Sequence, residues 1–194
     1  MFIKNWKKEI LTIPNLLSLF RLLLIPVYMV IYLNAAKVSH YYLAASILAV
    51  SCLTDLIDGK IARRFHMIST VGKILDPLAD KATQFTLIVC LAMRYPVLMH
   101  LVVLFVMKEG FQLIAGGITL TKGMMLEGAL LPGKICTTVL FVSLILMVML
   151  PELGYGYVKW ITAIDAIFMS VAFGSYIWAY FGKSKKIHDL TEYE

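Results

Sequence analysis

The sequence predicts an all-α integral membrane protein with six transmembrane helices and both termini in the cytoplasm. Two observations support this fold class. The 194 residues are 60% hydrophobic and only 15% charged, whereas soluble domains are about half apolar and about a quarter charged, so too little polar surface remains to cover a soluble core. The apolar residues also form six stretches, each near the length of about 20 residues that a helix needs to cross a bilayer.

The six stretches take up most of the chain, so we expect one domain, residues 1–194, without a separate soluble part. Pro14 lies near the start of the first stretch, Pro96 marks the turn between the third and the fourth, and Pro151 opens the link between the last two. The first stretch contains Arg21 and is long, which favours a retained span over a cleaved signal peptide. The predicted spans are residues 12–33, 41–62, 73–94, 96–121, 132–151 and 157–181.

The basic residues predict the orientation. With six spans, one face of the membrane receives Lys37, Arg94 and Lys159, and the other receives most of the remaining Lys and Arg. Because basic residues concentrate on the cytoplasmic side, we expect a multi-pass protein of the cell membrane with both termini in the cytoplasm. The net charge of +6 then reflects this bias and contact with anionic lipid headgroups, and we expect no nucleic-acid partner. The residues on the more basic face include Lys4, Lys7, Lys8, Arg63, Arg64, Lys122, Lys183, Lys185 and Lys186.

Four aspartates, Asp55, Asp58, Asp76 and Asp80, fall within 26 residues of mostly apolar chain. A carboxylate inside a membrane is costly, so each is a candidate functional residue. Spacings of three and four residues place each pair on one helix face, and a hairpin of the two helices would bring all four together near the cytoplasmic surface. Such a cluster needs a countercharge. Because only oxygen ligands are present, we expect Mg²⁺, Mn²⁺ or Ca²⁺.

Small residues lie between these acids. Gly59, Ala62 and Gly72 leave the helix surfaces open for a flat or bulky group, although small residues also serve close helix packing. Arg63 lies eight residues after Asp55, near the same helix face, and can hold a phosphate by paired hydrogen bonds; its alternative role is to set the orientation of the span. Acids that hold a divalent cation, an arginine and a groove of small residues together suit diphosphate chemistry.

The spacing of these residues resembles the signature of the CDP-alcohol phosphatidyltransferases. The start of the first span, Ile13 to Ser18 with Arg21, and the six-span layout are also similar to that family. Within it, the segment from Leu75 to Lys81 is most similar to the phosphatidylglycerophosphate synthases and the related cardiolipin synthases. The matching pattern reads Asp55-x2-Asp58-Gly59-x2-Ala62-Arg63-x8-Gly72-x3-Asp76-x3-Asp80.

This resemblance implies an enzyme that transfers a phosphatidyl group from CDP-diacylglycerol to an alcohol and releases CMP. It implies Mg²⁺ or Mn²⁺ as the cofactor, with two ions expected, and a homodimer among membrane lipids. Asp55, Asp58 and Asp76 would bind metal, and Asp80 would both lie near the metal and act as the general base. For CDP, the resemblance implies binding by Asp55 and Arg63, with room for the cytidine made by Gly59, Ala62 and Gly72.

The acceptor expected from the resemblance is glycerol 3-phosphate, whose phosphate needs a second cationic pocket. The candidates are Lys134, Lys108, Arg21 and Lys73, although a lysine near a helix end also serves as an anchor at the membrane surface. The segment after Pro132 resembles the Gly-Lys-x-Lys-Thr stretch of the synthases, but Cys136 stands where the second lysine is expected. Phosphatidylglycerol, as in cardiolipin synthesis, or another alcohol therefore stays open as the acceptor.

Several other features suggest structural roles. The three cysteines lie in apolar segments at unrelated spacings and predict buried free thiols. Glu109 and Asp165 are further intramembrane acids, which we expect to pair with a nearby cation or hydroxyl group.

Two alternative classes of protein explain the four aspartates less well. A cation transporter would distribute its acids along the membrane depth and repeat them in an inverted second half, whereas these four cluster at one level. A scaffold protein has no need of four acids in helical register.

Overall fold

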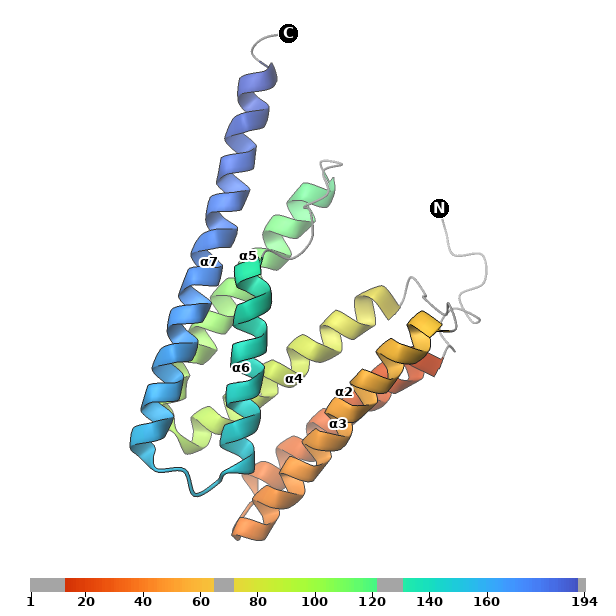
Figure 1. The fold of residues 1–194 in the computed structure, drawn as a ribbon, viewed down its shortest axis with the longest axis vertical. Helices are drawn as coiled ribbons and strands as arrows, with labels where there is room; N and C mark the ends of the chain where they lie inside the picture. Colours follow the sequence, from red (N-terminus) through yellow and green to blue (C-terminus); the bar gives the residue numbers. More distant parts are fainter. Residues whose placement is uncertain (1–12, 65–71, 122–130, 192–194) are drawn as a thin grey trace. The chain divides into compact units, whose positions relative to one another are not determined.

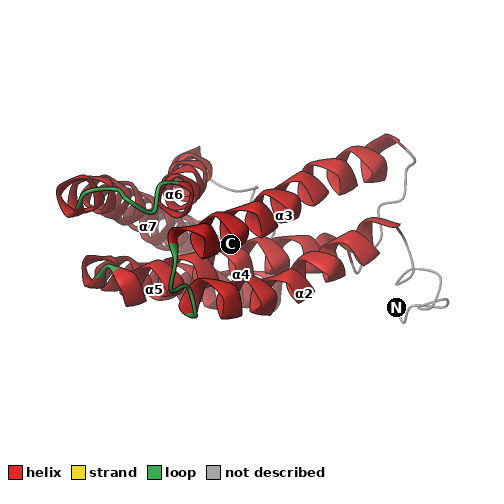
Figure 2. Ribbon diagram, turned by 90° about the horizontal axis from the view of Figure 1, so that it is seen from below, coloured by secondary structure: helices red, strands yellow, loops and turns green. Residues whose placement is uncertain are grey.

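The computed structural model describes residues 13–64, 72–121 and 131–191. Within these ranges all regular structure is helical, as Figure 2 shows, which confirms the predicted all-α fold. Each predicted span corresponds to one α-helix. The elements in Figure 1 are α2 (Ile13–Leu33), α3 (Val38–Arg64), α4 (Gly72–Arg94), the 3-10 helix η1 (Pro96–Leu98), α5 (Met99–Thr121), α6 (Leu131–Met149) and α7 (Tyr155–Thr191).

Proline and glycine set several of the helix boundaries. Pro96 opens η1, where its fixed φ angle suits the first helical position and its missing N–H group is not needed. Gly154 lies just before α7, and its carbonyl accepts the backbone N–H of Tyr157 at 2.9 Å. Two prolines lie inside helices: Pro26 in α2 and Pro77 in α4.

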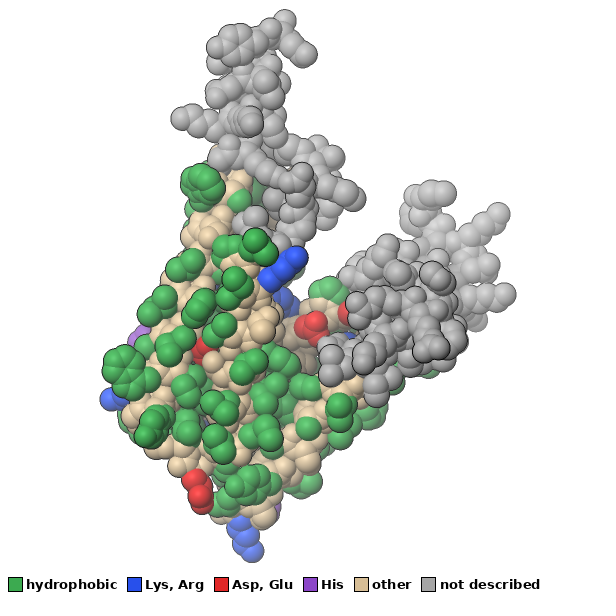
Figure 3. All heavy atoms as spheres, in the orientation of Figure 1, with side chains coloured by type: hydrophobic (Ala, Val, Ile, Leu, Met, Phe, Trp, Pro, Cys, Tyr) green, Lys and Arg blue, Asp and Glu red, His purple; other side chains and the backbone are tan. Residues whose placement is uncertain are grey.

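Four helical segments of the described chain are long and apolar enough to cross a membrane. Between 22% and 33% of the residues in these segments are buried inside the protein. The rest expose apolar side chains, among them Leu113 at 77% and Trp178 at 80%, and Figure 3 shows hydrophobic groups over most of the described surface on that face. Such a surface suits lipid rather than water, and the protein is a multi-pass membrane protein. The four segments are Asn15–Leu33, Pro96–Ile118, Leu131–Met149 and Tyr155–Phe181.

The other two helices, α3 and α4, are the ones that carry the aspartates. The apolar part of α3 that the structure describes is the shorter segment Val38–Thr54. Helix α4 carries Asp76, Asp80 and Lys81 in its first half, and these charges lower its apolarity. The six predicted spans are thus found as six helices, of which four meet the length and hydropathy expected of a membrane span.

The chain forms two compact units. The first contains residues 1–94 and 145–152, and in it α2 packs against both α3 and α4. The second contains residues 95–144 and 153–194, and in it α5 packs against α7. Within the second unit, Phe111 of α5 lies edge-on to Phe173 of α7, with 5.7 Å between the ring centroids. The Ser143 hydroxyl of α6 donates to Asp165 of α7 at 2.9 Å, which confirms the expected pairing of this acid.

In the first unit, Arg94 joins the end of α4 to α3 and to Pro151. Its guanidinium lies over the ring of Tyr41 of α3, 4.2 Å from the centroid, and it donates a hydrogen bond to the carbonyl of Pro151. The Tyr41 ring in turn meets Tyr32 of α2 edge-on at 5.2 Å. Cation–π and aromatic contacts of this kind hold the ends of three helices together.

In the second unit, the Tyr176 side chain of α7 reaches α6 at Gly133. A Cβ atom added there would lie 2.8 Å from two carbon atoms of the Tyr176 ring, a distance at which the two groups overlap. An alanine at this position would therefore require the Tyr176 side chain to move. The three cysteines are free thiols, as predicted; Cys90 and Cys136 are buried, whereas Cys52 is only half-buried.

Gly133→Ala should lower the free energy of unfolding, measured by SDS titration from mild detergent, by about 1–3 kcal/mol through overpacking. The matched control is Gly174→Ala in α7, where an added Cβ meets nothing within 4 Å, and it should have little effect or stabilise. Equal stability of the two variants would show that the approach of α6 and α7 at Gly133 is looser than described.

Candidate functional site

The candidate site lies where α2 and α4 come together in the first unit. Asp76 and Asp80 are four residues apart near the start of α4, so one turn of helix separates them. Helix α2 places three polar side chains at three-residue intervals, Asn15, Ser18 and Arg21, and all three are buried. This spacing keeps them on one helix face. A buried polar face in an otherwise apolar helix requires polar partners, which α4 supplies.

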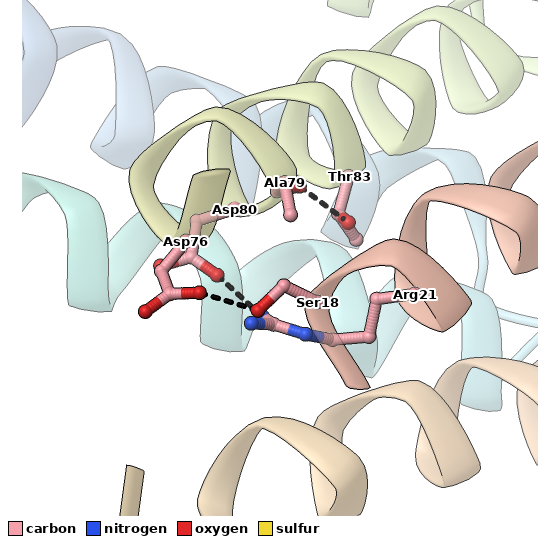
Figure 4. Close-up of polar contacts among 6 residues, drawn as sticks. All are labelled: Ser18, Arg21, Asp76, Ala79, Asp80 and Thr83. Carbon is pink, nitrogen blue, oxygen red and sulfur yellow. Dashed lines mark hydrogen bonds and ion pairs between the residues drawn. The ribbon is translucent and has the colours of Figure 1, made fainter. Parts of the chain in front are cut away.

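Two contacts join the helices (Figure 4). The Ser18 hydroxyl donates a hydrogen bond to Oδ1 of Asp76. The Arg21 Nη1 atom donates to Oδ1 of Asp80 at 2.7 Å and forms an ion pair with it. The two side chains of this pair differ in exposure: Arg21 is 3% exposed and Asp80 is 49% exposed. The carboxylate is therefore held by α2 and accessible to a ligand.

The ion pair stabilises the charge of both Arg21 and Asp80. A guanidinium buried in an apolar interior is strongly destabilising unless it is paired and hydrogen-bonded. Asp80 supplies the opposite charge to Arg21, and Arg21 supplies part of the countercharge that an aspartate cluster needs. The ion pair also fixes the Asp80 carboxyl group, since a side chain bonded to a second helix loses rotamer freedom.

The remaining predicted donor-site residues lie at the same end of the first unit. Figure 1 shows the start of α2, the end of α3 and the start of α4 together at that end. The α3 backbone is helical through the predicted positions, so the three-residue spacing of its aspartates corresponds to neighbouring positions on a helix. Their side chains lie outside the described residues, and convergence of all four aspartates stays a prediction. The positions concerned are Asp55, Asp58, Gly59, Ala62 and Arg63 in α3 and Gly72 in α4.

The predicted acceptor residues have different surroundings. Arg21 lies against Asp80, as described. Lys108 of α5 is buried, with its Nζ atom 2.6 Å from Oε1 of Glu109, which confirms the expected pairing of that acid with a cation. Lys134 is exposed near the start of α6. Lys108 and Lys134 belong to the second unit, and the side chain of Lys73 lies outside the described residues.

Sequence reasoning gave no role to Ser18 and Asn15, which the structure places on the site face of α2. The sequence does indicate such a role, because a polar residue recurs every three positions, at Asn15, Ser18 and Arg21, in a helix that is otherwise apolar. The buried face of an amphipathic helix is normally apolar, so polar residues at that period indicate a buried polar contact.

The donor set suits a hard divalent cation. Asp76 and Asp80 offer only carboxylate oxygens, the ligands that Mg²⁺ and Mn²⁺ prefer, and Asp76 is half-buried while Asp80 is accessible. Among the residues whose side chains are described, no three of His, Cys, Asp and Glu come together. The predicted further ligands are Asp55 and Asp58 of α3, whose side chains lie outside the described residues.

The fold and the site define a class: a multi-pass membrane protein with an aspartate site held between helices at one end of a helical unit. The family model for CDP-alcohol phosphatidyltransferases matches residues 11–177. The chain belongs to the CDP-alcohol phosphatidyltransferase family and is a phosphatidyltransferase.

Similar proteins include cardiolipin synthases and glycerol-3-phosphate phosphatidyltransferases. A cardiolipin synthase (CMP-forming) of Streptomyces coelicolor is 31% identical over 163 residues, covering 82% of this chain and 73% of that protein. A CDP-diacylglycerol–glycerol-3-phosphate 3-phosphatidyltransferase of Aquifex aeolicus is 37% identical over 139 residues, covering 71% of this chain and 74% of that protein. A cardiolipin synthase (CMP-forming)/mitochondrial hydrolase fusion protein of Schizosaccharomyces pombe is 42% identical over 90 residues, 45% of this chain, but the match spans only 14% of the fusion protein.

A double-mutant cycle tests the contact between α2 and α4. Arg21→Gln, Asp80→Asn and the double variant should show a coupling free energy of about 0.5–3 kcal/mol in SDS-titration unfolding, because the two side chains share one ion pair whose guanidinium is buried. The control cycle combines Arg21→Gln with Glu152→Gln, whose carboxylate is exposed, and should be additive. Additivity in both cycles would mean that the Arg21–Asp80 pair does not couple the helices.

Proposed function

We propose that this protein synthesises phospholipid by transferring a phosphatidyl group from CDP-diacylglycerol to glycerol 3-phosphate, giving phosphatidylglycerophosphate and CMP. The observation that carries the proposal is the family match across residues 11–177, within which Asp76 and Asp80 stand one turn apart. The relative from Aquifex aeolicus, named for the transfer to glycerol 3-phosphate, aligns along 74% of its length and supports this acceptor.

Phosphatidylglycerol is the second candidate acceptor. The relative from Streptomyces coelicolor, named as a cardiolipin synthase, aligns over 82% of this chain. Cys136 also stands where the glycerol-phosphate enzymes are expected to carry a second lysine, and a phosphodiester with one negative charge needs fewer cations than a phosphomonoester with two.

The aspartates divide the chemistry between them. Asp55, Asp58 and Asp76 would hold Mg²⁺ or Mn²⁺, expected as two ions, with Asp80 close by. When bound, the metal supplies positive charge that stabilises the phosphate oxygens of the departing CMP. In the donor pocket, Gly59 and Ala62 of α3 and Gly72 of α4 would make room for the cytidine, with Arg63 and Asp55 against the nucleotide diphosphate.

Asp80 is the proposed general base. Its side chain is 49% exposed, so an acceptor hydroxyl can approach the carboxylate and give up its proton as it attacks the phosphorus atom. The contact with Arg21 holds that carboxylate in one orientation, which favours proton transfer because a general base must lie within hydrogen-bond reach of its substrate. The hydrogen bond from Ser18 likewise holds the Asp76 carboxylate in one orientation.

The proposed membrane arrangement follows from the distribution of the basic residues. We propose six spans, with both termini and the aspartate end at the cytoplasmic face of the cell membrane, because the basic residues concentrate there. The diphosphate of the donor would then lie at the membrane surface, and its acyl chains would stay in the bilayer. We also propose that this single-domain chain forms a homodimer, as the resemblance to the family implies.

Asp80→Asn should abolish transfer, because the amide cannot accept the proton; general-base catalysis is worth about 10²–10⁴-fold in rate. The measurement is CMP release by purified protein in detergent, together with retained binding of CDP-diacylglycerol. Glu152→Gln, which removes an exposed acid from the loop after α6, is the matched control and should stay active. Full activity of Asp80→Asn would remove this residue from the role of base.

The acceptor is identified by offering glycerol 3-phosphate and phosphatidylglycerol separately to the purified protein with CDP-diacylglycerol and Mg²⁺ or Mn²⁺. We expect CMP release with glycerol 3-phosphate and its loss on chelation of the metal with EDTA. Release with phosphatidylglycerol alone would replace the first candidate by the second. If no alcohol supports release, the proposed activity is wrong.

A further inference from the structure

Helix α7, the blue helix in Figure 1, is longer than the hydrocarbon core of a bilayer is thick. Its 37 residues extend about 55 Å at 1.5 Å per residue, whereas the core is about 30 Å thick. Its apolar segment, Tyr155–Phe181, alone has 27 residues, more than the roughly 20 that cross the core. Only part of α7 therefore lies among acyl chains, and the burial of its side chains indicates which part.

Two opposite faces of α7 differ in burial. On each face the residues follow one another at alternating intervals of four and three, which keeps them on one side of a helix. The two sets are offset by two residues, about 200° around the helix axis. The buried face consists of Val158, Thr162, Asp165, Met169 and Ala172. The exposed face, called the outer stripe below, consists of Trp160, Ile164, Ile167, Val171, Gly174 and Trp178.

A tryptophan stands at each end of the outer stripe. Trp160 is 74% exposed and Trp178 is 80% exposed. Their 18-residue separation corresponds to about five full helical turns and about 27 Å, so the two indoles project from the same face at a distance close to the thickness of the hydrocarbon core. Tryptophan is enriched at both membrane–water interfaces, because its ring is apolar and its N–H group is polar.

Other aromatic and basic residues accompany the tryptophans. Near the first end, the Lys159 Nζ atom lies 4.8 Å from the centroid of the Tyr155 ring, which stacks against Tyr95 at 6.5 Å. Near the second end, Tyr180 meets Phe111 of α5 edge-on at 5.9 Å. Aromatic rings together with cations are typical of the headgroup layer, where the cations meet anionic headgroups. The sequence beyond the second end contains Lys183, Lys185 and Lys186.

The outer stripe suits acyl chains better than it suits a second copy of the chain. Between the two tryptophans the only charged residue in the sequence is Asp165, which is 1% exposed and accepts a hydrogen bond from Ser143 of α6. Helices that associate inside membranes meet through small residues and polar side chains. The outer stripe offers one small residue, Gly174, and is otherwise bulky and apolar.

We propose that the outer stripe of α7 contacts lipid acyl chains and that Trp160 and Trp178 lie in the headgroup layers of the two leaflets. These two residues then bound the hydrocarbon core along the helix. Beyond Trp178, α7 continues to Thr191, about 20 Å further, so the end of the helix projects from the membrane. The proposal rests on the membrane-spanning fold and is independent of the reaction proposed above.

The first test measures the depth of single indoles. The full-length protein has three tryptophans, and variants that keep one of them, with Phe at the other two positions, are reconstituted in dioleoylphosphatidylcholine vesicles. The vesicles contain lipids brominated either near the ester or near the chain end. Trp160 and Trp178 should be quenched more by the shallow bromines. Val171→Trp, made in a variant without the native tryptophans, should be quenched most by the deep bromines and lie about 10 Å deeper.

Two results of this measurement would overturn the proposal. Stronger quenching of either native indole by the deep bromines would remove that residue from the headgroup layer. Protection of the indole at position 171 from both kinds of brominated lipid would show that a second copy covers the outer stripe. The measurement on the two native tryptophans adds no side chain to the stripe, so it decides the boundaries even if Val171→Trp fails to fold.

The second test measures exposure to water in a variant whose three native cysteines are replaced by alanine. Vesicles of this protein are treated with a water-soluble maleimide on both sides of the membrane. Gly156→Cys, one turn outside Trp160 at a position where an added Cβ meets nothing within 4 Å, should be labelled fully. Ile167→Cys should stay unlabelled over the same time, because a thiol among acyl chains does not form the reactive thiolate. Label at Ile167→Cys, or none at Gly156→Cys, would contradict the proposed boundary.

Discussion

The ion pair between Arg21 and Asp80 is the interaction on which the rest of the site depends. A guanidinium that is 3% exposed inside an apolar helical unit is stable only with an anionic partner, and that partner is the proposed catalytic base. The same contact sets the axial register of α2 against α4, because a shift of either helix by one residue would part the two groups. Structural stability and the orientation of the carboxylate thus have one cause.

The other contacts of the first unit reinforce this arrangement. Ser18 holds Asp76 one turn before Asp80, so α2 fixes both carboxylates of α4. At the far end of α4, Arg94 lies over Tyr41 of α3. A helix held at both ends presents its side chains at reproducible positions, which catalytic groups need because small displacements are costly in rate.

Much of the fold could be predicted from the sequence, because hydrophobic stretches and prolines act locally. The end of α4 near Pro96 and the three-residue spacing of Asp55 and Asp58 are examples of local information. The role of α2 was less accessible. Helical period places Arg21 on a face with Ser18, but it does not say which helix that face meets, so the contact between Arg21 and Asp80 could not be predicted. The aspartate spacing predicts a hairpin of α3 and α4, and the structure adds that α2 packs against both helices.

The most direct test of the account is a measurement of Mn²⁺ binding to the purified protein by electron paramagnetic resonance. If α2 positions the carboxylates for a divalent cation, Ser18→Ala should weaken Mn²⁺ binding by about tenfold, the loss typical of a removed hydrogen bond to a metal ligand, and Asp76→Asn should weaken it further. Glu152→Gln should bind as wild type. Unchanged Mn²⁺ affinity in both Ser18→Ala and Asp76→Asn would contradict the central claim that α2 positions the carboxylates of α4 for a divalent cation.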